Sequence, residues 1–81
     1  MNYIMTITTV FRDSEDPTVN RRAFKTYDEA CKKMIEEFEK LNRQIMASDL
    51  TNLIGFTVVL NEWVGGNNYN RVAWLHHDMA L

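Results

Sequence analysis

Apolar residues between Tyr27 and about Ala47 recur at steps of three and four, the spacing of one stripe along a helix. Thr26 and Glu29 occupy the first and fourth positions of a capping box, which places the start of the helix at Tyr27. The pattern therefore predicts one long amphipathic helix that needs an apolar surface to lie on. The predicted stripe is Tyr27, Ala30, Cys31, Met34, Ile35, Phe38, Leu41, Ile45 and Met46.

The polar face of this helix carries acids and bases at a spacing of four residues, with each acid on the N-terminal side. Such pairs stabilise a helix by a few tenths of a kcal/mol each. The polar residues of 48–49 and 51–52 are expected to end the helix. The predicted ion pairs are Asp28–Lys32, Glu29–Lys33, Glu36–Lys40 and Glu39–Arg43.

Four other stretches are rich in β-branched and aromatic residues and predict strands over 3–11, 19–25, 53–64 and 69–77. In the first strand, the odd positions Tyr3, Met5, Ile7 and Phe11 should face the helix. In the third, Ile54, Phe56, Val58 and Leu60 should share one face, with Val59 and Trp63 on the other. In the fourth, Val72 and Trp74 should share one face, with Tyr69, Arg71, Ala73 and Leu75 on the other.

Turn residues join the strands in pairs. A polar loop over 13–18, which contains the one proline, should connect the first two strands, and Gly65-Gly66-Asn67-Asn68 should connect the last two. The element order is strand, strand, helix, strand, strand. We therefore predict a single α+β domain over 1–81, a ββαββ two-layer sandwich. Its four-stranded, mostly antiparallel sheet has one long helix across one face, with the first and third strands central.

Composition narrows the class of protein. A net charge of −2 excludes a generally basic nucleic-acid-binding protein but not a local basic patch. The one cysteine, Cys31, cannot form an intramolecular disulfide and suits a reducing compartment. We find neither a signal-peptide pattern nor an apolar run of membrane-spanning length, so we expect a cytoplasmic protein that does not enter a membrane.

One helix covers only one side of the predicted sheet. The other side should expose an apolar and aromatic patch with Arg71 among its members, and such patches mark interfaces. The face could serve a homodimer or a foreign protein; alternatively, Trp63 and Tyr69 simply cover the strand ends beside the turn. The apolar residues expected on this side are Ile4, Val10, Val59, Trp63, Tyr69 and Leu75.

Candidate chemistry is sparse. His76 and His77 are neighbours on a strand and should point to opposite faces, so they do not suit one metal ion. Cys31 fits a small core residue better than a nucleophile. Gly65-Gly66 joins two strands and lacks the pattern of a phosphate loop. With no carboxylate pair that looks buried, we expect neither an enzyme nor a cofactor or metal site.

A basic patch around the first hairpin is the main alternative. Basic residues beside aromatics on a sheet can bind single-stranded nucleic acid. The acids Asp13, Glu15 and Asp16 in the adjoining loop would oppose a phosphate backbone. The basic residues concerned are Arg12, Arg21, Arg22, Lys25 and Arg71.

Residues 24–30, Phe-Lys-Thr-Tyr-Asp-Glu-Ala, run from a strand end into a capped helix. In this phrase, in size and in element order, the chain resembles small accessory proteins of phages and mobile elements, including anti-CRISPR and other anti-defence proteins. The resemblance implies a stoichiometric inhibitor that binds a host protein and acts by occlusion. The expected partner-binding residues are Trp63, Tyr69, Arg71 and Leu75 on the sheet, or acids such as Glu15 and Asp16 that imitate phosphates.

Overall fold

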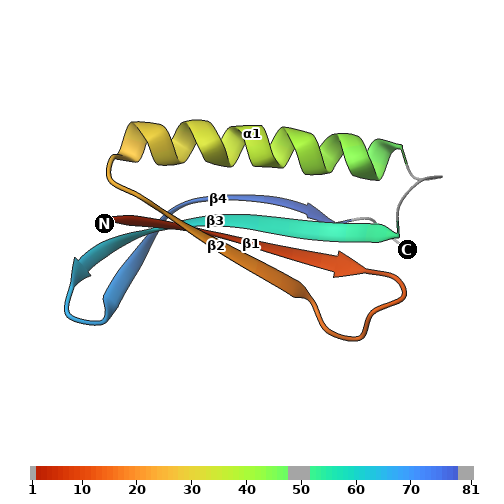
Figure 1. Cartoon of the computed structure of the whole chain (residues 1–81), viewed down its shortest axis with the longest axis horizontal. Helices are drawn as coiled ribbons and strands as arrows, with labels where there is room; N and C mark the ends of the chain where they lie inside the picture. The colour runs from red at the N-terminus through yellow and green to blue at the C-terminus, as the bar shows by residue number, and fades with distance from the viewer. Residues whose placement is uncertain (1, 48–51, 79–81) are drawn as a thin grey trace.

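Two layers make up the molecule, one helix and one sheet, as Figure 1 shows. The computed structural model describes residues 2–47 and 52–78. The elements are β1 (Tyr3–Phe11), β2 (Thr18–Phe24), α1 (Tyr27–Met46), β3 (Leu53–Gly65) and β4 (Asn68–Asp78). The predicted ββαββ order is therefore confirmed, and α1 lies across one side of the sheet.

The sheet has the strand order β2-β1-β3-β4, and every neighbouring pair is antiparallel. β1 and β3 are central, as predicted, because the chain returns from α1 to pair β3 with β1. Thr6 of β1 lies opposite Arg21 on one side and Val59 on the other. Residues at these positions share one face of the sheet, so the register shows which side chains face α1.

α1 begins as predicted, because the Thr26 hydroxyl accepts a hydrogen bond of 3.2 Å from the Glu29 N–H. Its buried residues are Ala30, Met34, Leu41 and Ile45. Tyr27, Ile35 and Met46 were also expected on the apolar stripe, but all three are exposed. Ile35 follows Met34 by one residue, which turns its side chain about 100° around the helix. Residues 48, 49 and 51, predicted to end the helix, lie outside the described residues.

The polar face of α1 does not form the predicted ion pairs. Within residues 2–47 and 52–78, one ion pair forms, between Lys33 Nζ and Glu37 Oε1 at 3.5 Å. In this pair the base precedes the acid, the reverse of the predicted order. Exposed Lys, Arg and Glu side chains gain little from pairing in water, so their spacing does not by itself fix their partners.

The core lies between α1 and the two central strands. α1 packs chiefly on β3, with fewer contacts to β1 and β2. Tyr3, Ile7, Phe11, Phe24 and Phe38 pack around the buried residues. The buried apolar residues are Met5, Ala30, Met34, Leu41, Ile45, Leu53, Phe56, Val58 and Leu60.

One core position of β3 differs from the prediction. Val10 pairs with Gly55 and Phe11 pairs with Leu53, so Ile54 is the extra residue of a β-bulge. Leu53 is therefore buried in the core, whereas Ile54 is half-buried and lies outside the core cluster. Strict alternation from Phe56 had predicted that Ile54, rather than Leu53, would face the core.

The second hairpin turns where the glycines predicted it. Gly65 and Gly66 have φ angles of 136° and 59°, which side-chain-bearing residues rarely adopt. Gly65 lies opposite Asn68, so Gly66 and Asn67 form the two-residue loop. A positive φ at the first loop position is typical of a type II′ turn.

Candidate partner-binding face

The side of the sheet opposite α1 has no layer over it among the described residues (Figure 1). We call this side the open face. The register assigns to it the even positions of β1 and the residues that lie opposite them. The larger side chains of the open face are Ile4, Val10, Val19, Arg21, Val59, Trp63, Tyr69, Arg71, Trp74 and His76.

Three exposed aromatic side chains lie on the open face of β3 and β4 between Val59 and the turn, and we call them the aromatic end. Trp63 and Tyr69 lie directly opposite each other, and Trp74 lies opposite Val59. Their exposed fractions are 42%, 47% and 55% for Trp63, Tyr69 and Trp74. Large aromatic side chains are thus left in water on a strand pair whose other side packs under α1.

Two internal contacts hold the aromatic end in place. Trp63 Nε1 donates a hydrogen bond of 2.8 Å to the Gly66 carbonyl oxygen. The Arg71 guanidinium carbon lies 4.6 Å from the centroid of the Trp74 ring, a cation–π contact. The indole N–H of Trp63 therefore already has an acceptor, and the Arg71 guanidinium is held over the Trp74 ring.

Leu75 does not belong to the open face, which corrects the prediction. It lies opposite the buried Val58 and packs against the core, and Trp74 takes the outward position instead. The cause is a β-bulge in β4: Leu60 pairs with Ala73 but Asn61 pairs with Arg71, so Val72 is extra. A bulge shifts the alternation by one residue, which keeps Arg71 outward but turns Ala73 and Leu75 inward.

A shallow hollow lies in the middle of the open face and has a volume of about 400 Å³. Ile4 and Val59 form its apolar part, and Arg21 and Tyr69 line it from β2 and β4. Thr6 and Asn61 complete its lining. The hollow therefore combines an aliphatic surface with an amide, a phenol and a guanidinium.

Comparison with protein-family models, curated proteins and solved structures finds no match to this chain. A function therefore has to be argued from the open face and its charges. No helix among the described residues combines the length and the apolar character needed to cross a membrane.

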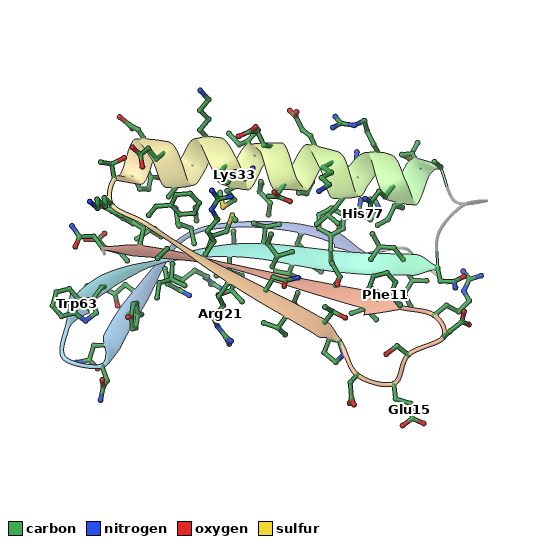
Figure 2. The ribbon with its side chains drawn as sticks, viewed as in Figure 1. Phe11, Glu15, Arg21, Lys33, Trp63 and His77 are labelled. Carbon is green, nitrogen blue, oxygen red and sulfur yellow. The ribbon has the colours of Figure 1, made fainter. Side chains whose placement is uncertain are left out.

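The charged side chains described on the open face are two arginines. Arg21 on β2 and Arg71 on β4 stand on the two edge strands, and Figure 2 shows Arg21 pointing away from α1. Among the described residues, the register places one acid on the open face, Asp78 at the end of β4, which pairs with Gly55. The other described acids lie on α1, in the loop between β1 and β2, and at Glu62, which pairs with Tyr3 on the side of α1.

Glu15 and Asp16, the predicted acidic contacts, are exposed in the loop between β1 and β2. Figure 2 places Glu15 and Trp63 at opposite ends of the sheet. Neither acid forms an ion pair within the described part of the chain. The sheet residues and the acidic residues that were predicted as alternative contact sites are therefore separate surfaces.

The predicted basic patch is divided between two faces. Arg21 belongs to the open face, but its neighbour Arg22 lies opposite the buried Met5, on the side of α1. There the Arg22 guanidinium carbon lies 5.4 Å from the centroid of the Phe24 ring. Neighbouring strand residues point to opposite sides, so the two arginines cannot act as one patch.

The two histidines point to opposite faces, as predicted. His77 stacks on Phe56 on the side of α1, with ring centroids 5.6 Å apart and planes 8° from parallel (Figure 2). His76 Nδ1 lies 3.3 Å from the Thr57 hydroxyl oxygen in a hydrogen bond on the open face. Over residues 2–47 and 52–78, no three His, Cys, Asp or Glu side chains gather as metal ligands would.

Cys31 is half-buried and packs against the core. Its side chain also forms a hydrogen bond with Tyr27, which raises the pKa of the Tyr27 phenol above its ordinary value. Tyr27 packs in turn on Tyr3, with ring centroids 5.8 Å apart. The thiol therefore belongs to a packed cluster at the start of α1.

Proposed function

We propose that the protein is a binding module that captures a protein partner on its open face. The observation that carries the proposal is the aromatic end, where Trp63, Tyr69 and Trp74 stand exposed beside Arg71. Trp, Tyr and Arg are the residues that most often dominate binding energy at interfaces. Exposed patches of this kind on small proteins mark interaction sites.

The internal contacts of the aromatic end support this function. Binding immobilises side chains at a cost of about 0.5–1.5 kcal/mol for each flexible one. Trp63 is already held by Gly66, and Arg71 is already stacked on Trp74. Less conformational freedom is then lost when a partner covers them, so more of the burial free energy contributes to affinity.

Charge favours a foreign protein over a second copy. If two open faces packed together, Arg21 and Arg71 of both copies would enter one interface, in which the register places one acid for each copy among the described residues, Asp78, so the arginines would be in excess. Unpaired charges lose hydration on burial without compensation. A foreign partner can supply the missing acids.

The inhibitor hypothesis is a special case of this proposal. A module that covers part of a host protein would block that protein stoichiometrically, with no catalytic step of its own. Phosphate imitation by Glu15 and Asp16 would use the loop at the other end of the sheet instead. Reversing both acids to lysine separates the two versions, since only the loop version predicts a loss of inhibition.

The test of the proposed function is the double substitution Tyr69→Ala with Trp74→Ala. Proteins that the immobilised chain retains from a bacterial lysate are identified by mass spectrometry, purified and titrated by calorimetry. Truncation of a hot-spot aromatic costs about 2 kcal/mol or more, so we expect the affinity to fall by roughly thirty-fold or more.

Ile35→Ala is the matched control. Ile35 is a large apolar residue on α1 with 51% of its surface exposed, close to the 55% of Trp74, but it lies on the other side of the molecule. We expect this variant to bind like the original chain. Equal affinities for the original chain and the Tyr69/Trp74 variant would disprove the proposed function.

Single-stranded nucleic acid is the second candidate, because Arg21 and Arg71 share the open face with the exposed aromatics. Such binding would lose affinity steeply as salt rises, because phosphate contacts release counterions. Absence of binding to a single-stranded oligonucleotide at about 50 mM salt, where such contacts are strong, would eliminate this candidate.

A further inference from the structure

We infer that the open face selects an acidic protein segment: an extended or exposed stretch whose carboxylates meet Arg21 and Arg71 and whose apolar side chain enters the hollow. This inference rests on the proposed function and names the chemistry of the partner. It follows from the sign and placement of the charges, the lining of the hollow and the contacts of Arg71.

The two arginines lie at opposite edges of the open face, and the one acid that the register places there among the described residues, Asp78, stands at the end of β4 opposite Gly55. Arg21 belongs to β2 and Arg71 to β4, the outer strands of the sheet. Neither has an ion-pair partner among the described residues. A guanidinium binds a carboxylate through two parallel hydrogen bonds, so each arginine offers an unused site for an acid.

The hollow between the arginines suits an apolar side chain. Its aliphatic part, Ile4 and Val59, is half-buried in the sheet, and Tyr69 stands at its β4 side. Arg21 lines the same hollow. In a segment with an aromatic or aliphatic residue beside an acid, the apolar side chain can therefore fill the hollow while the acid pairs with Arg21.

Two features disfavour nucleic acid at this face. Arg71 lies over the Trp74 ring at 4.6 Å and covers a surface on which a base would stack. Glu15 and Asp16 carry unpaired charges at the far end of the sheet, where they would repel a continuous phosphate chain. An acidic protein segment carries fewer charges and can avoid that end.

The chain contains a built-in reporter of this surface. It has two tryptophans, Trp63 and Trp74, and both belong to the aromatic end. Tryptophan fluorescence, excited where tyrosine does not absorb, therefore responds to binding at the open face. A ligand on the outer surface of α1 would leave it unchanged.

The experiment titrates the purified full chain with a random copolymer of glutamate and tyrosine at low salt. A copolymer of lysine and tyrosine tests the sign of the charge, and polyglutamate tests charge without an apolar side chain. Single-stranded oligothymidine is the nucleic-acid arm. We expect saturable fluorescence changes with the glutamate–tyrosine copolymer at lower concentrations than with any other probe.

Charge-reversal variants test whether Arg21 and Arg71 bind the acidic probe. Arg71→Glu and Arg21→Glu should each weaken binding of the glutamate–tyrosine copolymer by roughly three- to ten-fold, the effect of turning one exposed attraction into a repulsion. Both should strengthen binding of the lysine–tyrosine copolymer. Lys40→Glu, an exposed residue of α1 with the same change in charge, should alter neither. Circular dichroism verifies that each variant is folded.

Three results would overturn the inference: equal binding of the acidic and basic copolymers, no binding of either, or tighter binding of oligothymidine. Loss of protein capture in the Tyr69/Trp74 variant together with equal copolymer binding would leave the proposed function intact and refute only the acidic preference. The two failures are therefore distinguishable.

Discussion

Trp74 is the most exposed of the three residues of the aromatic end, although its neighbours Ala73 and Leu75 on β4 pack against the core. Its ring is not fully hydrated, because the Arg71 guanidinium lies over it. A cation–π contact at an exposed site contributes about 0.5–1 kcal/mol. The arginine thus shields an apolar ring while keeping its own N–H groups in water, where a partner can reach them.

Thr26 has a purely structural role, and its contribution can be measured. Thr26→Ala removes the acceptor of the Glu29 N–H and should lower the free energy of unfolding by about 1 kcal/mol, the usual contribution of an N-cap. Urea denaturation measures this change.

Thr26→Ser retains the hydroxyl and serves as the control, with an expected change of only about a few tenths of a kcal/mol, because Ser caps a helix at least as well as Thr. If both variants lost the same stability, the hydrogen bond would not be the source of the effect.

β4 shows how one extra residue decides which side chains become functional. Before Val72, the outward positions are Tyr69 and Arg71; after it, they are Trp74 and His76. Bulges commonly redirect side chains in this way near binding sites. Here the bulge brings Arg71 and Trp74 to the same side although they are three residues apart, whereas regular alternation of the same sequence would turn them to opposite sides.

Deletion of Val72 tests this account of the bulge. Without Val72, Ala73 can pair with Leu60 and Arg71 with Asn61 in a regular ladder. All the remaining side chains of β4 then keep their faces. We expect this variant to fold, with a stability within about 1–2 kcal/mol of the original, as for a surface change that removes one exposed apolar residue.

Deletion of Trp74 in the same strand is the control. It makes Ala73 and Leu75 neighbours, so one of them must leave the side of α1. Thermal unfolding followed by circular dichroism should show a large loss of stability for this deletion only. Similar unfolding curves for both deletions would contradict the assigned register.

The whole molecule has two unlike sides. α1 presents acids and bases together, whereas the open face carries aromatics, two arginines and, at the end of β4, Asp78. The sheet is covered on one side only, and the molecule measures 42 × 24 × 18 Å. An interface on this scale is compatible with the roughly 800 Å² per partner of a standard protein–protein complex.

We predict that the chain does not form a stable dimer through the open face, because self-pairing would bring four arginines together. Light scattering at several protein concentrations should give the mass of a single chain, 9.5 kDa. Arg71→Glu should not change that mass.

A dimer that persists on dilution and dissociates on Tyr69→Ala with Trp74→Ala would show that a second copy occupies the face. A homodimer, the other occupant expected for the open face, would then replace the foreign protein in the proposed function.

Local patterns in the sequence predicted the elements well. The helix, expected over residues 27–47, ends at Met46, and the strand predictions agree with the observed bounds to within a residue at each end. Thr26 was recognised as the cap, and the glycine pair as the turn. These features depend on the spacing of neighbouring residues, which the sequence displays directly. Trp63, Tyr69 and Arg71 were also placed correctly on the open face.

Tertiary pairing decided the rest of the face. Trp74 was missed and Leu75 was wrongly assigned, because the bulge at Val72 exists only in the pairing of β4 with β3. The same holds for Leu53 and Ile54 at the other end of β3. Arg21 and Arg22 look like one patch in the sequence and lie on two faces in the fold. Alternation along a strand can be read locally, but a one-residue shift in it depends on the partner strand, since only the ladder shows which residue is left unpaired.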